Sequence, residues 1–278
     1  MERTLNIGIL AHVDAGKTSL TEQILFRAGV VAAPGSVDKG TAQTDTLDLE
    51  RQRGISIQSA VTSFRVDDLT INLIDTPGHA DFIAEVERVI GVLDAVVLVI
   101  SAVEGVQPQT RRLSRAIANL GLPCLIFINK IDRAGARADA LLDEICRELH
   151  RDPVPLSTVA GLGTREASAQ PSDVADLATA AGIVDVLSRH DDELLERFVE
   201  SDGELCVAEI VEALRRQVAS ATVTPLVHGS AMTGAGVDTL LRAVADLVPA
   251  ELGSTSESLS AEAFKVQRLP TGERVLLC

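Results

Sequence analysis

Residues 11–18 read Ala-His-Val-Asp-Ala-Gly-Lys-Thr and carry the residue types of a phosphate-binding loop. An apolar run over residues 5–10 precedes them and an amphipathic run over residues 19–26 follows, which predicts a strand, a loop and a helix. Such a turn directs main-chain N–H groups and a helix N-terminus toward phosphate. Lys17 stands where this pattern places a lysine for the outer phosphates, and Thr18 where it places a hydroxyl for Mg²⁺.

One position departs from the pattern, because its first glycine is Ala11 in this chain. Small-residue turns between a strand and a helix also occur as plain packing, so this segment alone leaves both interpretations open. The residues that we predict to contact the nucleotide here are Ala11, His12, Val13, Asp14, Ala15, Gly16, Lys17 and Thr18.

Three further motifs each follow a predicted strand. They are Asp75-Thr76-Pro77-Gly78, Asn129-Lys130-Ile131-Asp132 and Ser230-Ala231. Open α/β sheets bind ligands at the carboxyl ends of their strands, and an aspartate there can hold a magnesium-bound water. Each motif is short enough to arise by chance, but the whole set in this order predicts a guanine-nucleotide site.

The four motifs together resemble those of the P-loop GTPases. The resemblance implies that the Asp132 carboxylate accepts hydrogen bonds from N1 and the exocyclic amine of guanine. It also implies that Asn129 and Lys130 support the loop and cover the base, and that the main chain of Ser230-Ala231 meets the guanine carbonyl. Leaving two buried groups unpaired, at about 1–3 kcal/mol each, would disfavour adenine by roughly 10²–10⁴. We therefore expect GTP and GDP as substrate and product, with Mg²⁺ as the cofactor.

The residue after Gly78 narrows the resemblance. His79 in this place is similar to the translational GTPases, whereas signalling GTPases usually carry glutamine. The resemblance makes His79 the catalytic residue that positions the attacking water; the alternative is a plain residue at a helix start. After Arg53-Gly54-Ile55 the family commonly has threonine, and Ser56 keeps the hydroxyl that would join Mg²⁺. The implied metal ligands are Thr18, Ser56 and Asp75.

Within the elongation factor G branch, residues 35–41 and 44–55 and the motif at residues 228–231 most resemble the tetracycline-resistance ribosomal protection proteins. The resemblance runs from residue 6 to about residue 248 and is weak between residues 153 and 184. It implies a GTPase that the ribosome stimulates and that frees the ribosome of tetracycline. Two alternatives stay open: a translocation factor of the elongation factor G type, and a GTP-gated switch with negligible turnover.

Composition restricts the class of protein. The chain has 278 residues, 46% of them hydrophobic, with a mean hydropathy of +0.22, which predicts a globular fold. We see no apolar run long enough for a membrane helix and no signal peptide, and the four cysteines lack CxxC spacing, so we expect a cytoplasmic protein without a membrane partner. A net charge of −15 and the absence of Trp and Tyr disfavour a general nucleic-acid binder, including a DNA binder. We expect a monomer that meets the ribosome through a small local surface.

The elements that position the motifs alternate between strand and helix, which predicts an α/β fold. Together with the motifs, this order resembles a P-loop GTPase domain. Its mostly parallel six-stranded sheet has helices on both faces and one antiparallel hairpin. We expect strands at residues 6–11, 60–66, 70–75, 95–101, 124–129 and 224–229. We expect helices at residues 17–28, 82–92, 108–120, 138–149 and 237–248. Residues 30–58 lack a clear period and form the expected switch.

We divide the chain into a GTP-binding domain at residues 1–250, a linker at 251–260 and the start of a second domain at 261–278. The first domain includes an insertion at about 153–223, with helices at 173–201 and 204–219, which we interpret mainly as structural. Its expected apolar face is Leu187, Leu194, Leu195, Phe198, Ile210, Val211 and Leu214. Residues 261–278 form a β-hairpin that resembles the opening of the family's β-barrel domain, so we expect the N-terminal piece of a longer protein.

Overall fold

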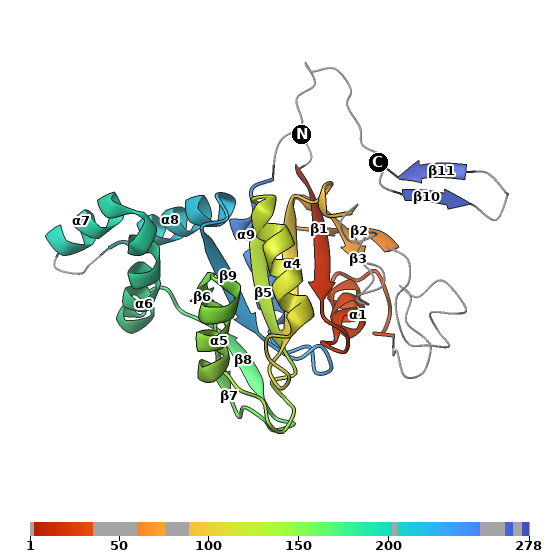
Figure 1. Ribbon diagram of the computed structural model, residues 1–278, viewed down its shortest axis with the longest axis horizontal. Coiled ribbons are helices and arrows are strands. Elements are labelled where there is room, and N and C mark those ends of the chain that lie inside the picture. Colours follow the sequence, from red (N-terminus) through yellow and green to blue (C-terminus); the bar gives the residue numbers. More distant parts are fainter. Residues whose placement is uncertain are drawn as a thin grey trace, which may run out of the picture.

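The computed structural model describes residues 3–35, 60–75, 89–201, 205–250, 265–268 and 274–277. A seven-stranded sheet forms its centre, in the order β2-β3-β1-β4-β5-β9-β6 (Figure 1). The strands are β1 (Arg3–Ala11), β2 (Ala60–Val66), β3 (Leu69–Asp75), β4 (Ala95–Ser101), β5 (Cys124–Asn129), β6 (Asp152–Pro155) and β9 (Val223–His228). All neighbours pair in parallel except β2 and β3, which form the predicted antiparallel hairpin.

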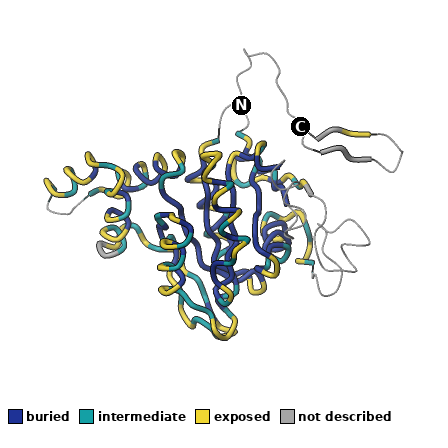
Figure 2. The backbone as a smooth tube through the Cα atoms, viewed as in Figure 1, coloured by how far each residue is buried: buried dark blue, intermediate teal, exposed yellow. Residues whose placement is uncertain are grey.

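Helices cover both faces of this sheet. One core layer contains side chains of α1 (Lys17–Arg27) and α9 (Val237–Leu247), and the other contains side chains of α4 (Pro108–Asn119) and α5 (Asp139–Leu149). The central strand β4 is buried along its whole length, as expected for a parallel strand that is covered on both sides. Figure 2 shows the strands at the centre of the molecule in dark blue, with the exposed residues on the helices and loops around them. The predicted fold class is therefore confirmed, with one strand more than expected.

The additional strand is β6, at the edge of the sheet beside β9. Its four residues include Pro153 and Pro155, and proline cannot donate a hydrogen bond to a neighbouring strand. Such a sequence argues against a strand, so the expectation of six strands was wrong. An edge position tolerates these prolines because only one side of β6 pairs.

The predicted insertion contains a hairpin and three helices. The hairpin strands are β7 (Ser157–Ala160) and β8 (Ser168–Pro171), neither of which we predicted, and the helices are α6 (Leu177–Leu187), α7 (Asp192–Glu200) and α8 (Val207–Ala219). The first expected helix is thus divided, with a short 3₁₀ turn at Ser188–His190 between its halves. Leu187, Leu194, Ile210 and Leu214 are buried as expected, but Leu195 is 43% exposed, on the outer side of α7.

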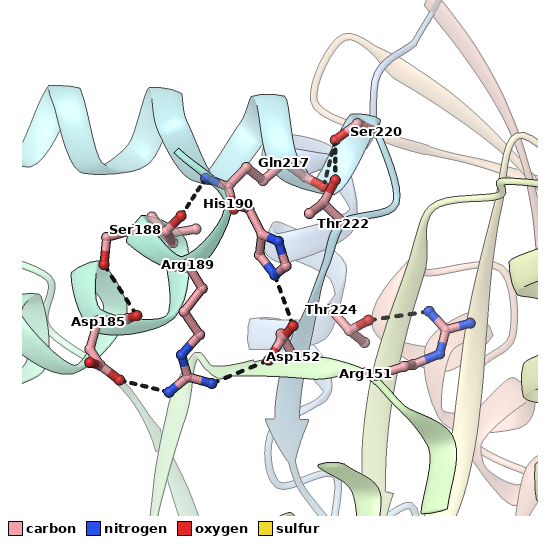
Figure 3. Close-up of polar contacts among 11 residues, drawn as sticks. Arg151, Asp152, Asp185, Ser188, Arg189, His190, Gln217, Ser220, Thr222 and Thr224 are labelled. Carbon is pink, nitrogen blue, oxygen red and sulfur yellow. Dashed lines mark hydrogen bonds and ion pairs between the residues drawn. The ribbon is translucent and has the colours of Figure 1, made fainter. Parts of the chain in front are cut away.

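The insertion is fastened to the edge strand by charged side chains (Figure 3). Asp152 on β6 accepts a hydrogen bond from Arg189 at 3.2 Å and lies 2.8 Å from His190 Nε2. Arg189 also pairs with Asp185 on α6 at 2.7 Å. These contacts hold the helical part of the insertion at the side of the sheet, next to β6.

Four expectations fall on the remaining parts of the chain. Of the helix predicted at 82–92, the structure describes a helical Val89-Ile90. Most of the expected switch, residues 36–58, and the expected linker at 251–260 lie outside the described residues. The expected hairpin after the linker is confirmed in its strands, β10 (Lys265–Arg268) and β11 (Arg274–Leu277), which pair antiparallel. In the described residues no helix is long and apolar enough to cross a membrane.

Candidate functional site

The loop between β1 and α1 has the backbone of a phosphate-binding turn. Gly16 is left-handed, with φ of 91°, and α1 begins at the next residue, Lys17. A Cβ on Gly16 would lie 2.2 Å from Nδ2 of Asn129, so a side chain is excluded there. Ala11 instead ends β1 in register with Val99 of β4, where a Cβ fits the strand. The departure from the glycine pattern at Ala11 is therefore compatible with the loop.

Lys17 forms a buried ion pair with Asp75 at the end of the neighbouring strand β3. The two side chains are 7% and 4% exposed, so the pair is shielded from water. Thr18, which follows in α1, is half-buried. The predicted lysine and the predicted metal-binding aspartate are thus brought together beside the loop, although they are 58 positions apart in the sequence.

Asn129 connects the loop to the third motif. Its Nδ2 donates to the main-chain oxygen of Ala15 at 2.8 Å, and its Oδ1 accepts from the main-chain N–H of Ala231 at 2.8 Å. The side chain is 2% exposed. One amide therefore holds the phosphate loop and the Ser230-Ala231 loop at a fixed separation, across the carboxyl end of β5.

The Ser230-Ala231 loop is a closed turn. Ser230 N donates to Ala235 O at 3.0 Å, and Ser230 Oγ accepts from Thr233 N at 3.2 Å. A Cβ on the preceding Gly229 would lie 2.3 Å from Ala235 O, so the turn requires glycine there. These contacts hold the main chain of Ala231 in a single position.

The chain from Lys130 to Asp132 crosses the same edge. Lys130 is left-handed, with φ of 68°, and its ammonium lies 3.1 Å and 3.3 Å from the two carboxylate oxygens of Glu104. Ile131 is fully buried, and its N–H donates to Gly229 O at 3.3 Å. Asp132 is half-buried beside this anchor. Asp75 and the two other strand-end motifs therefore meet at one edge of the sheet, as the sequence predicted.

The comparison with protein families agrees with this geometry. The model described as "Elongation factor Tu GTP binding domain" matches residues 2–250. The chain belongs to this family. The match covers the whole central sheet and the insertion, and it leaves the hairpin β10–β11 outside.

Similar proteins extend beyond this GTP-binding domain. The "Oxytetracycline resistance protein" of Streptomyces rimosus is 52% identical over 98% of this chain and 41% of its own length. "Tetracycline resistance protein TetM" of Streptomyces lividans is 48% identical over 98% of the chain and 43% of its own length. The chain thus spans about two fifths of these relatives. A crystal structure of a protein from Thermus thermophilus has the same fold, with a TM-score of 0.84 over 99% of the chain and 45% of its own, at 22% identity.

His12, the second residue of the GTP-binding domain's phosphate loop, turns its side chain away from the loop. Its Nδ1 lies 3.1 Å from Thr110 Oγ1 on α4, while the N–H of Val13 donates to Gln109 Oε1 at 3.3 Å. Burial lowers the pKa of His12, and the nearby Glu104 charge opposes this effect. A neutral imidazole therefore fastens the loop to the first turn of α4, and only the main chain of His12 remains for a nucleotide.

Sequence reasoning missed Glu104 as a member of the site. It follows β4 in a turn that Ser101 closes, because Ser101 Oγ accepts the N–H groups of Val103 and Glu104 at 3.2 Å and 3.3 Å. An acidic residue close to the carboxyl end of a buried strand is the signal that marked Asp75, and it could have drawn attention to Glu104, which lies three residues after the end of β4. Thr76, Pro77, Gly78, His79 and Ser56 lie outside the described residues, so their predicted roles stay predictions.

Proposed function

We propose that this chain binds GTP and hydrolyses it to GDP and phosphate, as the nucleotide module of a ribosome-dependent translational GTPase of the tetracycline-protection type. The observation that carries the proposal is the double hydrogen bond of Asn129, which joins the phosphate loop to the Ser230-Ala231 loop. A site of this form would hold the phosphates of the nucleotide (the phosphate end) and its base (the base end) on one rigid edge of the sheet.

The base end fits guanine. The half-buried Asp132 follows the anchored Ile131, so its carboxylate is available to the N1–H and amine of guanine. The main chain of the closed Ser230-Ala231 turn would face the guanine carbonyl, and the Ala231 N–H, which donates to Asn129 Oδ1 without the base, would turn to that carbonyl when guanine binds. Adenine has a donor where guanine has this carbonyl and has no proton on N1, so it would leave polar groups unpaired. We therefore expect GTP to be preferred over ATP by roughly 10²–10⁴.

The phosphate end supplies positive charge and oxygen donors. Lys17 is held at the loop by its ion pair with Asp75, close to where the outer phosphates would lie. The hydroxyls of Thr18 and Ser56 are hard oxygen ligands that fit Mg²⁺, and the carboxylate of Asp75 would hold the ion through a metal-bound water. When bound, Mg²⁺ neutralises charge on the phosphate oxygens. His79 would orient the attacking water through its imidazole.

The parts of the proposal that concern the ribosome and tetracycline are supported by the similar proteins. Two proteins named for tetracycline or oxytetracycline resistance share about half of their aligned residues with this chain. We propose that the chain works at the ribosome in the cytoplasm as a monomer. Its net charge of −15 means that a small local surface, rather than overall attraction to RNA, would provide the contact.

A hydrolysis assay with and without ribosomes tests the enzyme. We expect slow intrinsic turnover and strong stimulation by ribosomes, since a GTPase without its activating partner can be up to about 10⁵-fold slower. The variant His79→Ala should bind GDP within a few-fold of the wild type and lose roughly 10²–10⁴ of the stimulated rate. Tight GTP binding without any ribosome-stimulated turnover would contradict the proposal and favour the switch module.

A chimera tests the tetracycline role. This chain would replace the 274 aligned residues of the Streptomyces rimosus oxytetracycline resistance protein, and growth on oxytetracycline would be measured. Resistance with the chimera supports the proposal, and a His79→Ala chimera is the matched negative control. A chimera that accumulates and hydrolyses GTP on ribosomes, but gives no resistance, would favour the translocation-factor alternative.

A further inference from the structure

The β7–β8 hairpin, residues 157–171, lies at the nucleotide edge of the sheet. Its strands pair from Ser157 with Pro171 to Ala160 with Ser168. Figure 1 shows the hairpin at the end of the sheet toward which the arrow of β1 points, whereas α6 and α7 lie at the side. The first part of the insertion is therefore near the two loops that we expect to hold the base, residues 130–132 and Ser230-Ala231, which we call the base loops. The helical part of the insertion is not.

The base of the hairpin holds the strand that leads into the Ser230-Ala231 loop. Ser157 is 2% exposed, and its Oγ accepts the main-chain N–H of His228 at 2.8 Å. Nδ1 of His228 lies 3.2 Å from both Oγ and the main-chain oxygen of Ser157. His228 ends β9 two residues before Ser230, so the Ser157 hydroxyl fixes the point from which this loop starts.

The tip of the hairpin reaches the other base loop. The N–H of Gly163 donates to the main-chain oxygen of Ile131 at 2.8 Å. Gly163 is left-handed, with φ of 80°, which a side chain would strain. Ile131 lies between Lys130 and Asp132. Along its length, β8 also lines one hollow together with residues 233–236 of the Ser230-Ala231 loop.

From these contacts we propose that the β7–β8 hairpin positions both base loops, with Ser157 and Gly163 as its positioning residues. The inference rests on the proposed guanine site and gives a function to part of the insertion. A base that both loops hold leaves slowly only while the loops keep their separation. Loosening the hairpin therefore speeds release of the base end and leaves the phosphate loop unchanged.

The first test compares two buried serines in the full chain. Ser157→Ala removes the acceptor of the His228 N–H, and we expect fluorescent GDP to dissociate about three- to tenfold faster. Ser114→Ala is the matched control, because Ser114 is also 2% exposed and its Oγ accepts from Arg151 Nε at 2.9 Å, on α4. The Ser114→Ala variant should release GDP at the wild-type rate, although its loss of thermal stability should be similar to that of Ser157→Ala.

Two readouts separate positioning from general damage. Ser157→Thr keeps the hydroxyl and should restore slow release. Inorganic tripolyphosphate, which has no base, should compete for the phosphate loop equally well in Ser157→Ala and the wild type. Release that is unchanged in a folded Ser157→Ala, or not restored by threonine, would overturn the inference. If the wild type bound no guanine nucleotide at all, the proposed function itself would fail.

A second pair of variants tests the tip. Gly163→Ala strains the left-handed backbone that presents its N–H to Ile131, although its Cβ would meet no atom closer than 3.6 Å. Gly121→Ala carries the same type of strain, with φ of 63° and nothing within 4 Å, at the end of α4. We expect faster GDP release for Gly163→Ala only. Equal release from both folded variants would count against a positioning role for the tip.

Discussion

Replacing Asn129 by alanine should uncouple the two ends of the nucleotide site. The substitution removes one buried amide and leaves its two partners without it: the Ala15 oxygen, now 2.8 Å from Nδ2, and the Ala231 N–H, now 2.8 Å from Oδ1. Each bond contributes about 1 kcal/mol net, and an unpaired buried group costs about 1–3 kcal/mol. With two groups left unpaired, we therefore expect the free energy of unfolding of the nucleotide-free protein to fall by about 2–6 kcal/mol.

Nucleotide release should change as well as stability. Without the amide, the Ser230-Ala231 loop loses its link to the phosphate loop, so GDP should dissociate at least about tenfold faster, which corresponds to roughly 1.4 kcal/mol. Urea denaturation monitors the first quantity and stopped-flow release of fluorescent GDP the second. Asn129→Asp keeps the acceptor for Ala231 but sets an oxygen against the Ala15 carbonyl, so it reports on the phosphate-loop bond separately.

Asn72 provides the control for these measurements. Its amide also joins two partners, accepting from Ser63 Oγ at 2.6 Å and donating to Asn6 Oδ1 at 2.9 Å, within the first three strands. Asn72→Ala should lower stability while GDP release stays at the wild-type rate. If Asn129→Ala released GDP no faster than Asn72→Ala, the amide would not couple the two loops and the reasoning would be refuted.

Three further substitutions test the loops at the base end of the site and the buried His228. Glu104→Gln should speed GDP release about two- to fivefold, more at low salt than at high salt, because a partly exposed ion pair with Lys130 is worth about 0.2–1 kcal/mol; no salt dependence would contradict this. Asp132→Asn should shift preference from GTP toward xanthosine triphosphate in competition binding, and an unchanged preference would remove Asp132 from base reading. Burial lowers the pKa of His228 in the folded state, so the unfolded chain binds a proton first and stability should fall as pH drops below about 6.5. His228→Gln should reduce this loss of stability between pH 7.5 and pH 5.5, measured by urea titration at each pH. An equal loss in the variant and the wild type would show that other groups cause it.

Strands that are buried on both faces could be predicted from the sequence almost residue by residue. The predicted bounds of the strands at Ala95–Ser101 and Cys124–Asn129 agree with the structure, because a continuous apolar run has no other place in a parallel sheet. The edge strand Asp152–Pro155 could not be predicted, because two of its four residues are prolines and proline is excluded from the interior of a sheet. The hairpin strand Ser168–Pro171 has no apolar alternation that would mark it as a strand, and its pairing with Ser157–Ala160 forms only in the folded hairpin.

The candidate site also has contacts that could be predicted from the sequence and contacts that could not. Lys17, Asp75 and Asn129 were predicted to meet because each adjoins the carboxyl end of a parallel strand, which the fold class alone determines. The contact of Ser157 with His228 depends instead on the route of an insertion over 71 positions, and a serine carries no signal of its partner. Local motifs therefore predict where the nucleotide lies, but not what holds the motifs in place.

The glycines of the phosphate loop show why a motif and its tertiary contacts have to be considered together. Ala11 replaces a glycine of the pattern without consequence for the turn, because it is still part of β1 and pairs with Val99. Gly16 cannot be replaced in this way, and its left-handed φ of 91° is only part of the reason. The amide of Asn129 occupies the space that a Cβ would need, 2.2 Å away. The requirement for glycine at this position is thus imposed by the guanine motif on the next strand but one, and the two motifs of this GTP-binding domain form one structural unit.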